Sequence, residues 1–569
     1  MIVAATALRR LVGHPLAPIA VLCTALLANA AVLLSFQRGM TFLIDEWLLL
    51  VERQAWDLDT FLTPFYEHLF LAPILVFKVL MSTIGIGPHW VYAVPLLALH
   101  LTCAILVYAL ARSRVGPWFA LAPAVLILFL GSSYDNLLLP IQVSFLGSLA
   151  AGLGMLLVFD HTPSRRLDAT ASLLLLGALA SSSLGLVIAV AALVEILLTP
   201  GWRRRIWVVL TPAAIYGLWY LAYGPRGLEQ GGSLRTNLLY VPGHAADSAA
   251  AVFGALSGLG LEWGRVLAVF AVVVLARAFL RGDVLSARSI ALVVAVVSFW
   301  VLGGLARAHQ DTPEASRYIY LGAAFVILLV LEALRRVRLD RRWALLLTAF
   351  VAFAVVGNAD VLRGARDTHL VYSRDLSAQF AALEILGPEA VEPSFVAAIN
   401  LAPLVEAEEY FDMVSALGSP VDLERDVLAS GVDGRRVADE VFAAAFAGSA
   451  QRDATLDRGA SAPTVEHARF GVTTRAGPCT RFDAREVEAS LSVRMHGRGM
   501  LIQATKGPTT LRLRRLGESF QLVRKIESSS PLALPLPSGG VTTPWRFQAA
   551  TRGAVEICAA EVGERSRVP

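Results

Sequence analysis

The stretch from Leu16 to Trp47 reads LAPIAVLCTALLANAAVLLSFQRGMTFLIDEW. Its first part, up to Phe36, is apolar, long enough to cross a bilayer, and without the small-residue cleavage site of a secretion signal. The polar segment behind it carries two adjacent acids, Asp45 and Glu46. Carboxylates beside hydrocarbon are costly and tend to be kept for chemistry. The stretch therefore predicts a first membrane helix followed by part of an active site.

The composition places the chain in a membrane class. Of its 569 residues, 56% are hydrophobic and 17% are charged, and the mean hydropathy is +0.61, which lies outside the range of soluble globular domains. The net charge is only +4, and the usage of Ala, Arg and Val is typical of a GC-rich bacterial genome. We expect a polytopic α-helical protein of the plasma membrane, in contact with membrane lipid and without a nucleic-acid partner.

Apolar runs recur along the first two thirds of the chain and predict about eleven membrane helices. They lie at roughly 16–36, 90–111, 118–131, 138–159, 168–180, 184–199, 206–223, 264–280, 288–305, 318–334 and 342–362. The run 69–86 contains Lys78 and ends in Gly-Ile-Gly-Pro. We interpret it as a re-entrant or interfacial helix, because a span there would put basic loops on both sides of the membrane.

Arginine-rich loops set the predicted orientation. If 69–86 does not span, all of them fall on one side, which the positive-inside rule makes cytoplasmic. These loops contain Arg9–Arg10, Arg112 and Arg114, Arg165–Arg166, Arg203–Arg205, Arg277 and Arg281, and Arg335–Arg342. The N-terminus is then cytoplasmic, and the segment 37–89, a Gly-rich and mobile loop 224–247, and everything after residue 362 are extracytoplasmic.

The sequence changes character after residue 362, so we divide it into a membrane domain 1–362 and a soluble α+β domain 363–569. Amphipathic helices are expected over 363–450 and a β-sandwich-like portion over 464–569, with 531–544 as a Pro/Gly-rich loop. Cys479 and Cys558 can pair across strands in an oxidising compartment. Trp545 is a candidate for carbohydrate binding.

Several motifs together resemble the GT-C superfamily of polyprenyl-phosphate-sugar-dependent glycosyltransferases, such as mannosyl- and arabinosyltransferases. They are Asp45-Glu46-Trp47, the sequence PFYEH at 64–68, the sequence YALARSR at 108–114, and Ser316-Arg317-Tyr318. The resemblance covers roughly residues 1–160. It implies that first-loop acids form the catalytic centre, that the donor's lipid tail lies between spans, and that the C-terminal domain assists acceptor or carbohydrate binding.

The resemblance also suggests roles for the acids. Asp45 is the expected general base, because the first acid of the pair is the commoner catalytic position, and Glu46 would orient the acceptor or a metal ion such as Mg²⁺ or Mn²⁺. Plainer interpretations are helix N-capping for Asp45 and a solvated interfacial acid for Glu46. No zinc or nucleotide-binding motif is present, which argues against nucleotide-sugar chemistry, and the sequence does not demand a metal ion.

Further substrate-binding candidates lie in the predicted outer loops. Glu67 and His68 would hold the acceptor or move a proton, or would form an interfacial pair. Asp135 would join the same cleft or form a turn, and Gln142 would bind the sugar or another helix. Residues that would hold the donor phosphate, if their cations do not merely snorkel to headgroups, are Arg317, its neighbour Tyr318, His309 and Lys78.

These expectations favour one function over two others. The favoured one is a glycosyltransferase that moves a hexose or pentose from a polyprenyl-phosphate sugar to a glycan, lipid or protein acceptor. The others are a flippase for a lipid-linked saccharide and a non-catalytic membrane anchor that binds glycan. The acids cluster on one side and the spans contain few ionisable residues, which favours the enzyme.

Overall fold

The computed structural model describes residues 14–230, 234–281, 285–310, 312–337, 340–397, 405–448, 453–487, 489–527 and 531–563. Contacts divide the chain into two units. The first comprises Met1–Arg38, Glu52–Thr83 and His89–His369. The second comprises Gly39–Val51, Ile84–Pro88 and Leu370–Pro569. The second unit therefore includes two short segments from the beginning of the chain, one of which carries Asp45 and Glu46.

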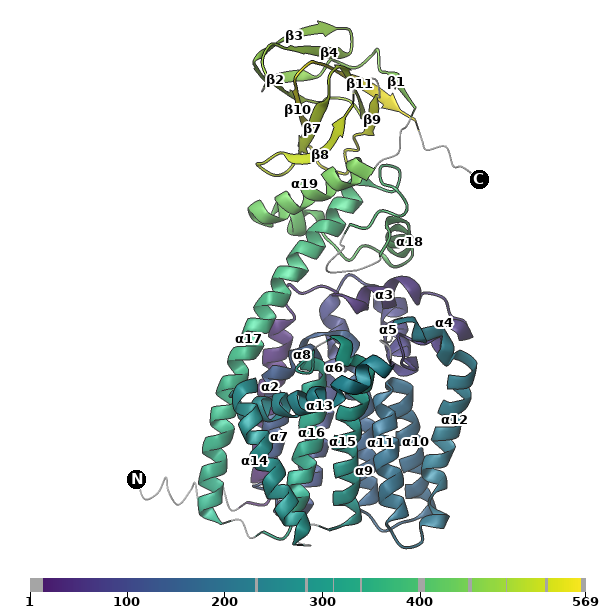
Figure 1. Cartoon of the computed structure of the whole chain (residues 1–569), viewed down its shortest axis with the longest axis vertical. Coiled ribbons are helices and arrows are strands. Elements are labelled where there is room, and N and C mark those ends of the chain that lie inside the picture. Colours follow the sequence, from purple (N-terminus) through teal and green to yellow (C-terminus); the bar gives the residue numbers. More distant parts are fainter. Residues whose placement is uncertain are drawn as a thin grey trace. The chain divides into compact units, whose positions relative to one another are not determined.

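The first unit is helical (Figure 1). Its helices up to residue 159 are α2 (Ala17–Phe36), α4 (Leu58–Leu62), α5 (Leu71–Ile84), α6 (His89–Val115), α7 (Leu121–Leu128), η1 (Gly131–Ser133), α8 (Tyr134–Leu138), η2 (Pro140–Gln142) and α9 (Val143–Phe159). The later ones are α10 (Arg165–Ser181), α11 (Leu184–Leu197), η3 (Trp202–Arg204), α12 (Trp207–Tyr223), η4 (Gly224–Gln230), α13 (Leu234–Ser257), α14 (Leu261–Leu280), α15 (Ala287–Arg307), η5 (Ala308–Gln310), α16 (Ser316–Leu334) and α17 (Arg341–Leu386), which continues into the second unit.

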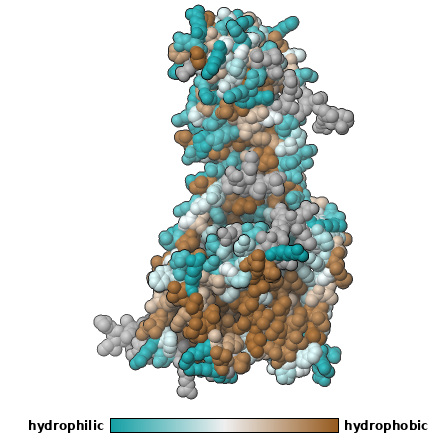
Figure 2. Space-filling model, viewed as in Figure 1, coloured by the Kyte–Doolittle hydropathy of each residue, from teal (hydrophilic) through white to brown (hydrophobic). Residues whose placement is uncertain are grey.

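The expected class of polytopic helical membrane protein is confirmed. Among the described residues, seven helices are long and apolar enough to cross a membrane, or eight if the bent pair Leu121–Leu128 and Gly131–Leu138 is one span. In Figure 2 apolar side chains gather over these helices and hydrophilic ones at their lower ends. The predicted count of about eleven is not confirmed. Helix α11 has only 14 residues, and α10 and α12 have 17 each, which is the lower limit of the roughly 17 to 25 residues of a membrane-spanning helix.

The predicted span 118–131 is bent by 43° between α7 and η1. Backbone groups freed by a break at membrane depth must find partners inside the protein. Polar side chains supply them: Asn29 donates to the Leu128 carbonyl at 2.6 Å, and the Asn358 side-chain oxygen accepts from the Ser132 amide at 2.9 Å. The Asn29 side chain is held in turn by His100 at 3.1 Å. Polar residues of distant spans thus stabilise the break.

One end of the helices carries the basic connections. Figure 1 shows the connections α9–α10, α11–α12 and α14–α15 at the lower end of the unit. Two buried arginines there form a chain of ion pairs. Arg114 binds Glu332 and both oxygens of Asp160 at 2.8 and 3.0 Å, and Arg288 binds Glu195 at 2.7 Å and Asp160 at 3.3 Å. The predicted basic pair at residues 9 and 10 lies outside the described residues.

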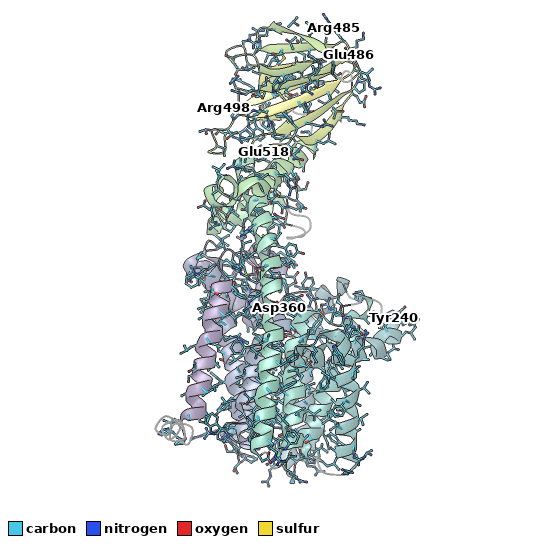
Figure 3. All side chains as sticks on the ribbon, turned by 90° about the vertical axis from the view of Figure 1, so that its left-hand side faces the viewer. Tyr240, Asp360, Arg485, Glu486, Arg498 and Glu518 are labelled. Carbon is cyan, nitrogen blue, oxygen red and sulfur yellow. A yellow bond between two sulfur atoms is a disulfide. The ribbon has the colours of Figure 1, made fainter. Side chains whose placement is uncertain are left out.

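The prediction of a mobile loop over 224–247 is wrong. Most of this segment belongs to helix α13, which packs against α14, α15 and α16. The sequence suggested a loop because the first part of this segment is rich in glycine. Proline normally ends a helix, but Pro242 nevertheless lies inside α13. Side chains of its second half are buried, and those near its start, Leu238, Leu239 and Tyr240, are exposed. In Figure 3 Tyr240 points away from the helices, a position suited to a membrane interface.

The second unit contains α3 (Asp45–Glu52), α18 (Ala407–Leu417), the π-helix η6 (Glu424–Leu428), α19 (Gly431–Gly448) and eleven strands. An aromatic cluster packs α3 against this unit. Trp47 is 1% exposed, its ring lies 4.3 Å from that of Phe380, and its indole N–H donates to the Phe42 carbonyl at 2.7 Å. Tyr410 of α18 stacks on Phe380 at 4.4 Å. Helices α18, η6 and α19 thus precede the strands of this unit along the chain.

The strands form two antiparallel sheets, which confirms the predicted sandwich. They are β1 (Ala454–Leu456), β2 (Thr464–Arg469), β3 (Gly471–Ala476), β4 (Cys479–Ala484), β5 (Ser490–Arg494), β6 (Gly499–Lys506), β7 (Thr509–Arg514), β8 (Gln521–Ile526), β9 (Leu532–Pro535), β10 (Arg546–Thr551) and β11 (Ala554–Val562). One sheet has the order β3-β4-β11-β6-β9 with β1 paired to β11, and the other the order β2-β5-β10-β7-β8. Cys479 and Cys558, register partners on β4 and β11, form a disulfide.

Two expectations for this unit are wrong. The segment 531–544 is not all loop, because it contains β9, an edge strand bounded by Pro531 and Pro535 as proline in sheets requires. Trp545 cannot stack on a sugar from solution, because it is 4% exposed, lies 5.0 Å from the ring of Phe442 and donates to the Pro537 carbonyl at 3.1 Å. It is a core residue.

Candidate functional site

A tight turn presents Glu67 and His68 next to each other. Phe65 and His68 exchange two backbone hydrogen bonds of 3.1 Å. Tyr66, the first residue between them, has a φ of 54°, which is uncommon outside glycine but is required at this position of the favoured hairpin turns. Gly227 packs on the turn so closely that a Cβ at position 227 would lie 2.0 Å from the backbone carbonyl oxygen of Tyr66. Strained backbone of this kind clusters at functional sites.

The turn forms one wall of a cavity of about 230 Å³ inside the first unit. The other walls come from the start of α11, the middle of α13, the end of α15 and the start of α16, helices that pack on one another and lie close together in Figure 1. Most lining side chains are apolar. The polar ones, apart from the Trp300 indole, are Glu67, His68, Ser183, His244, Ser248, Arg307 and Tyr318.

Two pairings organise the polar side of this cavity. Glu67 forms an ion pair with Arg307, the last residue of α15. His68 shares a hydrogen bond of 2.6 Å between its Nδ1 and the Ser183 hydroxyl, and its Nε2 lies 3.8 Å from Glu67. Burial lowers the pKa of His68, Glu67 opposes this effect, and Arg307 and Arg317 add to it. His68 is therefore neutral near pH 7 and can accept a proton.

The start of α16 places Tyr318 in the cavity wall. Its ring lies 6.2 Å from that of Phe145, and the Phe145 ring lies 6.1 Å from the His68 imidazole. The Arg317 guanidinium lies 5.2 Å from the Tyr318 ring and is close enough to His68 to lower its pKa. The predicted residues Glu67, His68, Arg317 and Tyr318 are thus brought together by one helix start and one turn.

Asp135 and Gln142 lie beside the cavity wall rather than in it. The Asp135 backbone amide donates to the Ser316 hydroxyl at 3.3 Å. When the Asn136 side-chain amide is oriented so that both its nitrogen and its oxygen have hydrogen-bond partners, its nitrogen donates to the Ser316 and Arg317 carbonyls at 3.2 and 3.0 Å. The contacts of Asp135 and Asn136 hold the beginning of α16 and so position Arg317 and Tyr318. Gln142 lies next to the Asn136 side chain, 3.4 Å from its other end.

Lys78 is directed away from the cavity. It is 2% exposed, and its ammonium donates to the carbonyls of Arg53, Gln54 and Ala55 at 2.8, 3.0 and 2.5 Å. It also lies 4.7 Å from the Trp56 ring. An ammonium has three hydrogens, and all three are engaged by the backbone here. The side chain therefore neither snorkels nor contacts the cavity, and it stabilises the segment behind α3.

His309 is also outside the cavity wall. It lies in η5 with an exposed side chain, and its Nδ1 is 3.3 Å from the Asn237 amide nitrogen, which in turn donates to the Leu305 carbonyl at 2.8 Å. These contacts join α13 to the end of α15. The neighbouring Arg307 therefore takes the position by the cavity that the sequence suggested for His309.

Asp45 and Glu46 begin helix α3 in the second unit. Ile44, directly before them, has a φ of 48°, a conformation that is an outlier for a β-branched residue. Glu46 is fully buried, and its carboxylate accepts from the Leu43 amide at 2.9 Å, like the returning acid of a capping box. The interpretation of Glu46 as a solvated acid is therefore wrong. Asp45 is half-buried.

The acid pair offers little for a metal ion. One oxygen of the Glu46 carboxylate already accepts from the Leu43 amide. Among the residues described, the only grouping of three potential ligands is Cys479, Glu556 and Cys558, whose cysteines are consumed by the disulfide. A divalent cation at Asp45 and Glu46 stays a prediction.

Sequence reasoning missed four polar residues of the cavity wall, which are Arg307, Ser183, His244 and Ser248. Arg307 is an arginine at the helix end opposite to the basic loops, and this exception to the positive-inside rule is a usable signal. Ser183 lies in the Ser-Ser-Ser link between α10 and α11, which looked like a mere connection. His244 lies within α13, in the segment that the glycines suggested was a loop.

Comparisons with known proteins concern the fold. No protein-family model and no curated protein matches this sequence. The structure is similar to ArnT from Cupriavidus metallidurans bound to undecaprenyl phosphate, with a TM-score of 0.45 and 15% identity over 72% of this chain and 90% of that one. It is also similar to the arabinosyltransferase EmbB from Mycobacterium smegmatis, with a TM-score of 0.34 and 13% identity; the match covers 96% of this chain and 64% of EmbB.

Proposed function

We propose that this protein is a membrane glycosyltransferase that transfers a hexose or pentose from a polyprenyl-phosphate donor to a glycan, lipid or protein acceptor of the cell envelope, at the extracytoplasmic side. The observation that supports this most is the composition of the cavity in the first unit. It combines an apolar wall with an arginine, a glutamate, a neutral histidine and a tyrosine within one space.

A lipid phosphate needs this combination. An arginine offers paired N–H donors to phosphate oxygens and stays charged, and Arg307 occupies that place in the wall. Aliphatic and aromatic side chains of α11, α13, α15 and α16 provide the apolar surface for an isoprenoid chain. The Asp135 backbone amide and the Asn136 side chain contribute indirectly, because they bind the start of α16, and Gln142 lies next to Asn136. Lys78 has no part in phosphate binding under this proposal.

The chemistry is a substitution at the anomeric carbon of the sugar. A carboxylate removes the proton of the acceptor hydroxyl, the acceptor oxygen forms the new bond to the anomeric carbon, and the bond to the phosphate oxygen breaks. The leaving group is polyprenyl phosphate, whose negative charge an arginine stabilises. The carboxylate of the cavity wall itself is Glu67. Asp45 lies in the second unit and is our first choice of base from its sequence motif alone, and Glu46 holds the first turn of α3.

The first prediction tests this base. Asp45→Asn removes the proton acceptor while keeping the shape of the side chain, so we expect the release of polyprenyl phosphate from a panel of polyprenyl-phosphate sugars to fall by about 10² to 10⁴. The measurement is turnover by purified protein in lipid nanodiscs. Asp59→Asn is the matched control, because Asp59 is an exposed acid of the same N-terminal segment.

The outcomes separate the competing functions. Loss of turnover in Glu67→Gln but not in Asp45→Asn would move the base to the cavity. Transport of a lipid-linked saccharide across a vesicle membrane without release of polyprenyl phosphate would overturn the enzyme in favour of a flippase. Binding of glycan without turnover or transport would instead support the non-catalytic membrane anchor that binds glycan.

A further inference from the structure

The five-stranded sheet of the second unit has two very different faces. Its inner face is apolar: Leu491, Val493, Leu511, Leu513 and Phe547 are fully buried. Side chains alternate along a strand, so the neighbours of these residues point to the opposite face. That outer face carries mostly arginines and short polar residues, together with one lysine, His467 and the exposed Leu522.

Strand register arranges these residues in rows. In one row Arg494, Arg546 and Arg514 lie opposite one another on β5, β10 and β7. In the next row Gln548 lies between Ser492 and Arg512. A third row runs from one edge of the sheet to the other and consists of Arg469, Ser490, Ala550, Thr510 and Lys525. On this face, short side chains therefore lie between cationic side chains of neighbouring rows and strands.

The face is strongly cationic. The only acid in these five strands is Glu466, which binds Arg494 at 2.7 Å and Arg546 at 3.1 Å. The cations of the three rows are Arg469, Arg494, Arg512, Arg514, Arg546 and Lys525. Like charges directly opposite each other destabilise a sheet. Glu466 offsets this repulsion for two arginines of the trio, and Arg514 donates to the Glu518 carbonyl at 3.0 Å. The exposed cations of the face that no described ion pair involves are Arg469, Arg512 and Lys525, and these are the ones placed to bind a ligand.

We propose that this outer sheet face binds an anionic polysaccharide. Arginine forks match carboxylate and phosphate oxygens, and the hydroxyls and amide of Ser490, Thr510 and Gln548 suit the hydroxyl groups of sugars. Strands about 4.8 Å apart present the cations at regular intervals, as a repeating polymer requires. These strands carry no exposed Phe, Tyr or Trp side chain, so a neutral sugar chain would find little to stack on.

The chemistry of the same sandwich argues for a glycan rather than a nucleic acid. The disulfide between Cys479 and Cys558 joins the other sheet, and stable disulfides belong to oxidising compartments outside the cytoplasm. Anionic polymers of those compartments are envelope glycans with uronate or phosphate groups. This inference does not depend on the glycosyltransferase activity proposed above.

The test uses full-length protein in phosphatidylcholine nanodiscs and oligomers of polygalacturonate as the probe, with dextran as the neutral counterpart. The variant R469S/R512S removes two exposed cations that no described ion pair involves. We expect it to weaken binding of polygalacturonate about tenfold, as loss of two partly screened charge-assisted contacts predicts. Binding should also weaken with added salt.

A matched variant controls for net charge. R475S/R498S removes two exposed arginines of the same sandwich that lie outside the five-stranded sheet, one on β3 and one just before β6, and Figure 3 shows Arg498 on the flank of the sandwich. It should change binding less than twofold. R469K/R512K keeps the charge and should retain most of the affinity.

Three results would overturn the proposal. They are equal binding of dextran and polygalacturonate, an equal loss in R475S/R498S, and binding of phosphatidylglycerol vesicles that depends on Arg469 and Arg512 while polygalacturonate is ignored. The last result would make the face a membrane-binding surface. If the thermal unfolding temperature of R469S/R512S is unchanged, misfolding is excluded as the cause of lost binding. If R469S/R512S unfolds at a lower temperature, binding of polygalacturonate and of dextran is compared in R469K/R512K instead.

Discussion

The two ends of the helical unit both hold buried charges, but they arrange them differently. The same helices connect the ends: α11 runs from Ser183 by the cavity to Glu195, and α15 runs from Arg288 to Arg307. At the basic end, two arginines and three acids form a continuous chain of ion pairs. At the cavity end, one arginine and one glutamate pair beside open space.

The difference indicates which end is built for stability and which for binding. Each buried arginine at the basic end binds two acids that belong to other helices or their ends, and so holds those helices together. Breaking such a pair is expensive, because it leaves a charge buried without compensation. A pair at the wall of a cavity can instead exchange one partner for a ligand. Substitutions at the two ends should therefore affect different measurements.

The largest expected effect on stability is at the basic end. Arg288→Gln leaves Glu195, which is 11% exposed in its side chain, without its arginine, and we expect a loss of about 3 to 5 kcal/mol in the free energy of unfolding. Thermal or denaturant unfolding in detergent measures it. Arg265→Gln, at an exposed arginine paired with Asp247, is the control and should cost less than about 1 kcal/mol. Similar losses in both variants would remove the distinction between the ends.

The next effect belongs to the cavity end. Arg307→Gln removes a charged donor from the wall, so we expect the affinity for polyprenyl phosphate to fall by about 2 to 3 kcal/mol, the usual value of charged hydrogen bonds. Its unfolding free energy should change less than that of Arg288→Gln, because Glu67 is 33% exposed in its side chain and can be hydrated. Equilibrium binding to the purified variants measures the first quantity. Unchanged affinity would show that the phosphate lies elsewhere.

The difference between the ends was only partly predictable from sequence. The first span was expected at 16–36 and is Ala17–Phe36, and another was expected at 318–334 and is Ser316–Leu334. Local apolar runs determine such elements, so they can be recognised without the fold. The Glu67 and His68 pair could be singled out for the same reason, because adjacent polar residues before an apolar run are a local signal.

Pairings between distant segments could not be predicted. Glu67 and Arg307 are 240 residues apart, and His68 and Ser183 are 115 apart. Nothing in either local sequence specifies the other partner. Lys78 is a case in which the local sequence suggested the wrong partner. A lysine in an apolar run suggested a phosphate ligand, but its ammonium donates to backbone carbonyls of a turn that the sequence does not reveal. The misassigned loop over α13 concealed His244 in the same way.

A smaller effect concerns pH at the cavity end. Because burial lowers the pKa of His68 below its ordinary value of about 6.5, the unfolded chain binds this proton more readily than the folded one. Stability contributed by the neutral imidazole is present above about pH 6.5 and is lost as the pH falls toward the lowered pKa. His68→Gln should flatten this part of the pH profile of unfolding. An unchanged profile would mean that His68 is not the group responsible.

The smallest expected effect on the free energy of unfolding is at an exposed ion pair, which provides a direct comparison with the buried pairs of the basic end. Arg226 and Asp59 lie 3.3 Å apart, but their side chains are 54% and 72% exposed. Water solvates both charges before and after the pair breaks, so Arg226→Gln should change the free energy of unfolding by less than about 1 kcal/mol, and 0.5 M salt should abolish the change. The same unfolding assay as for Arg288→Gln measures it. If Arg226→Gln cost as much as Arg288→Gln, burial would not be what separates the ion pairs of this protein, and the basic end would lose its special role.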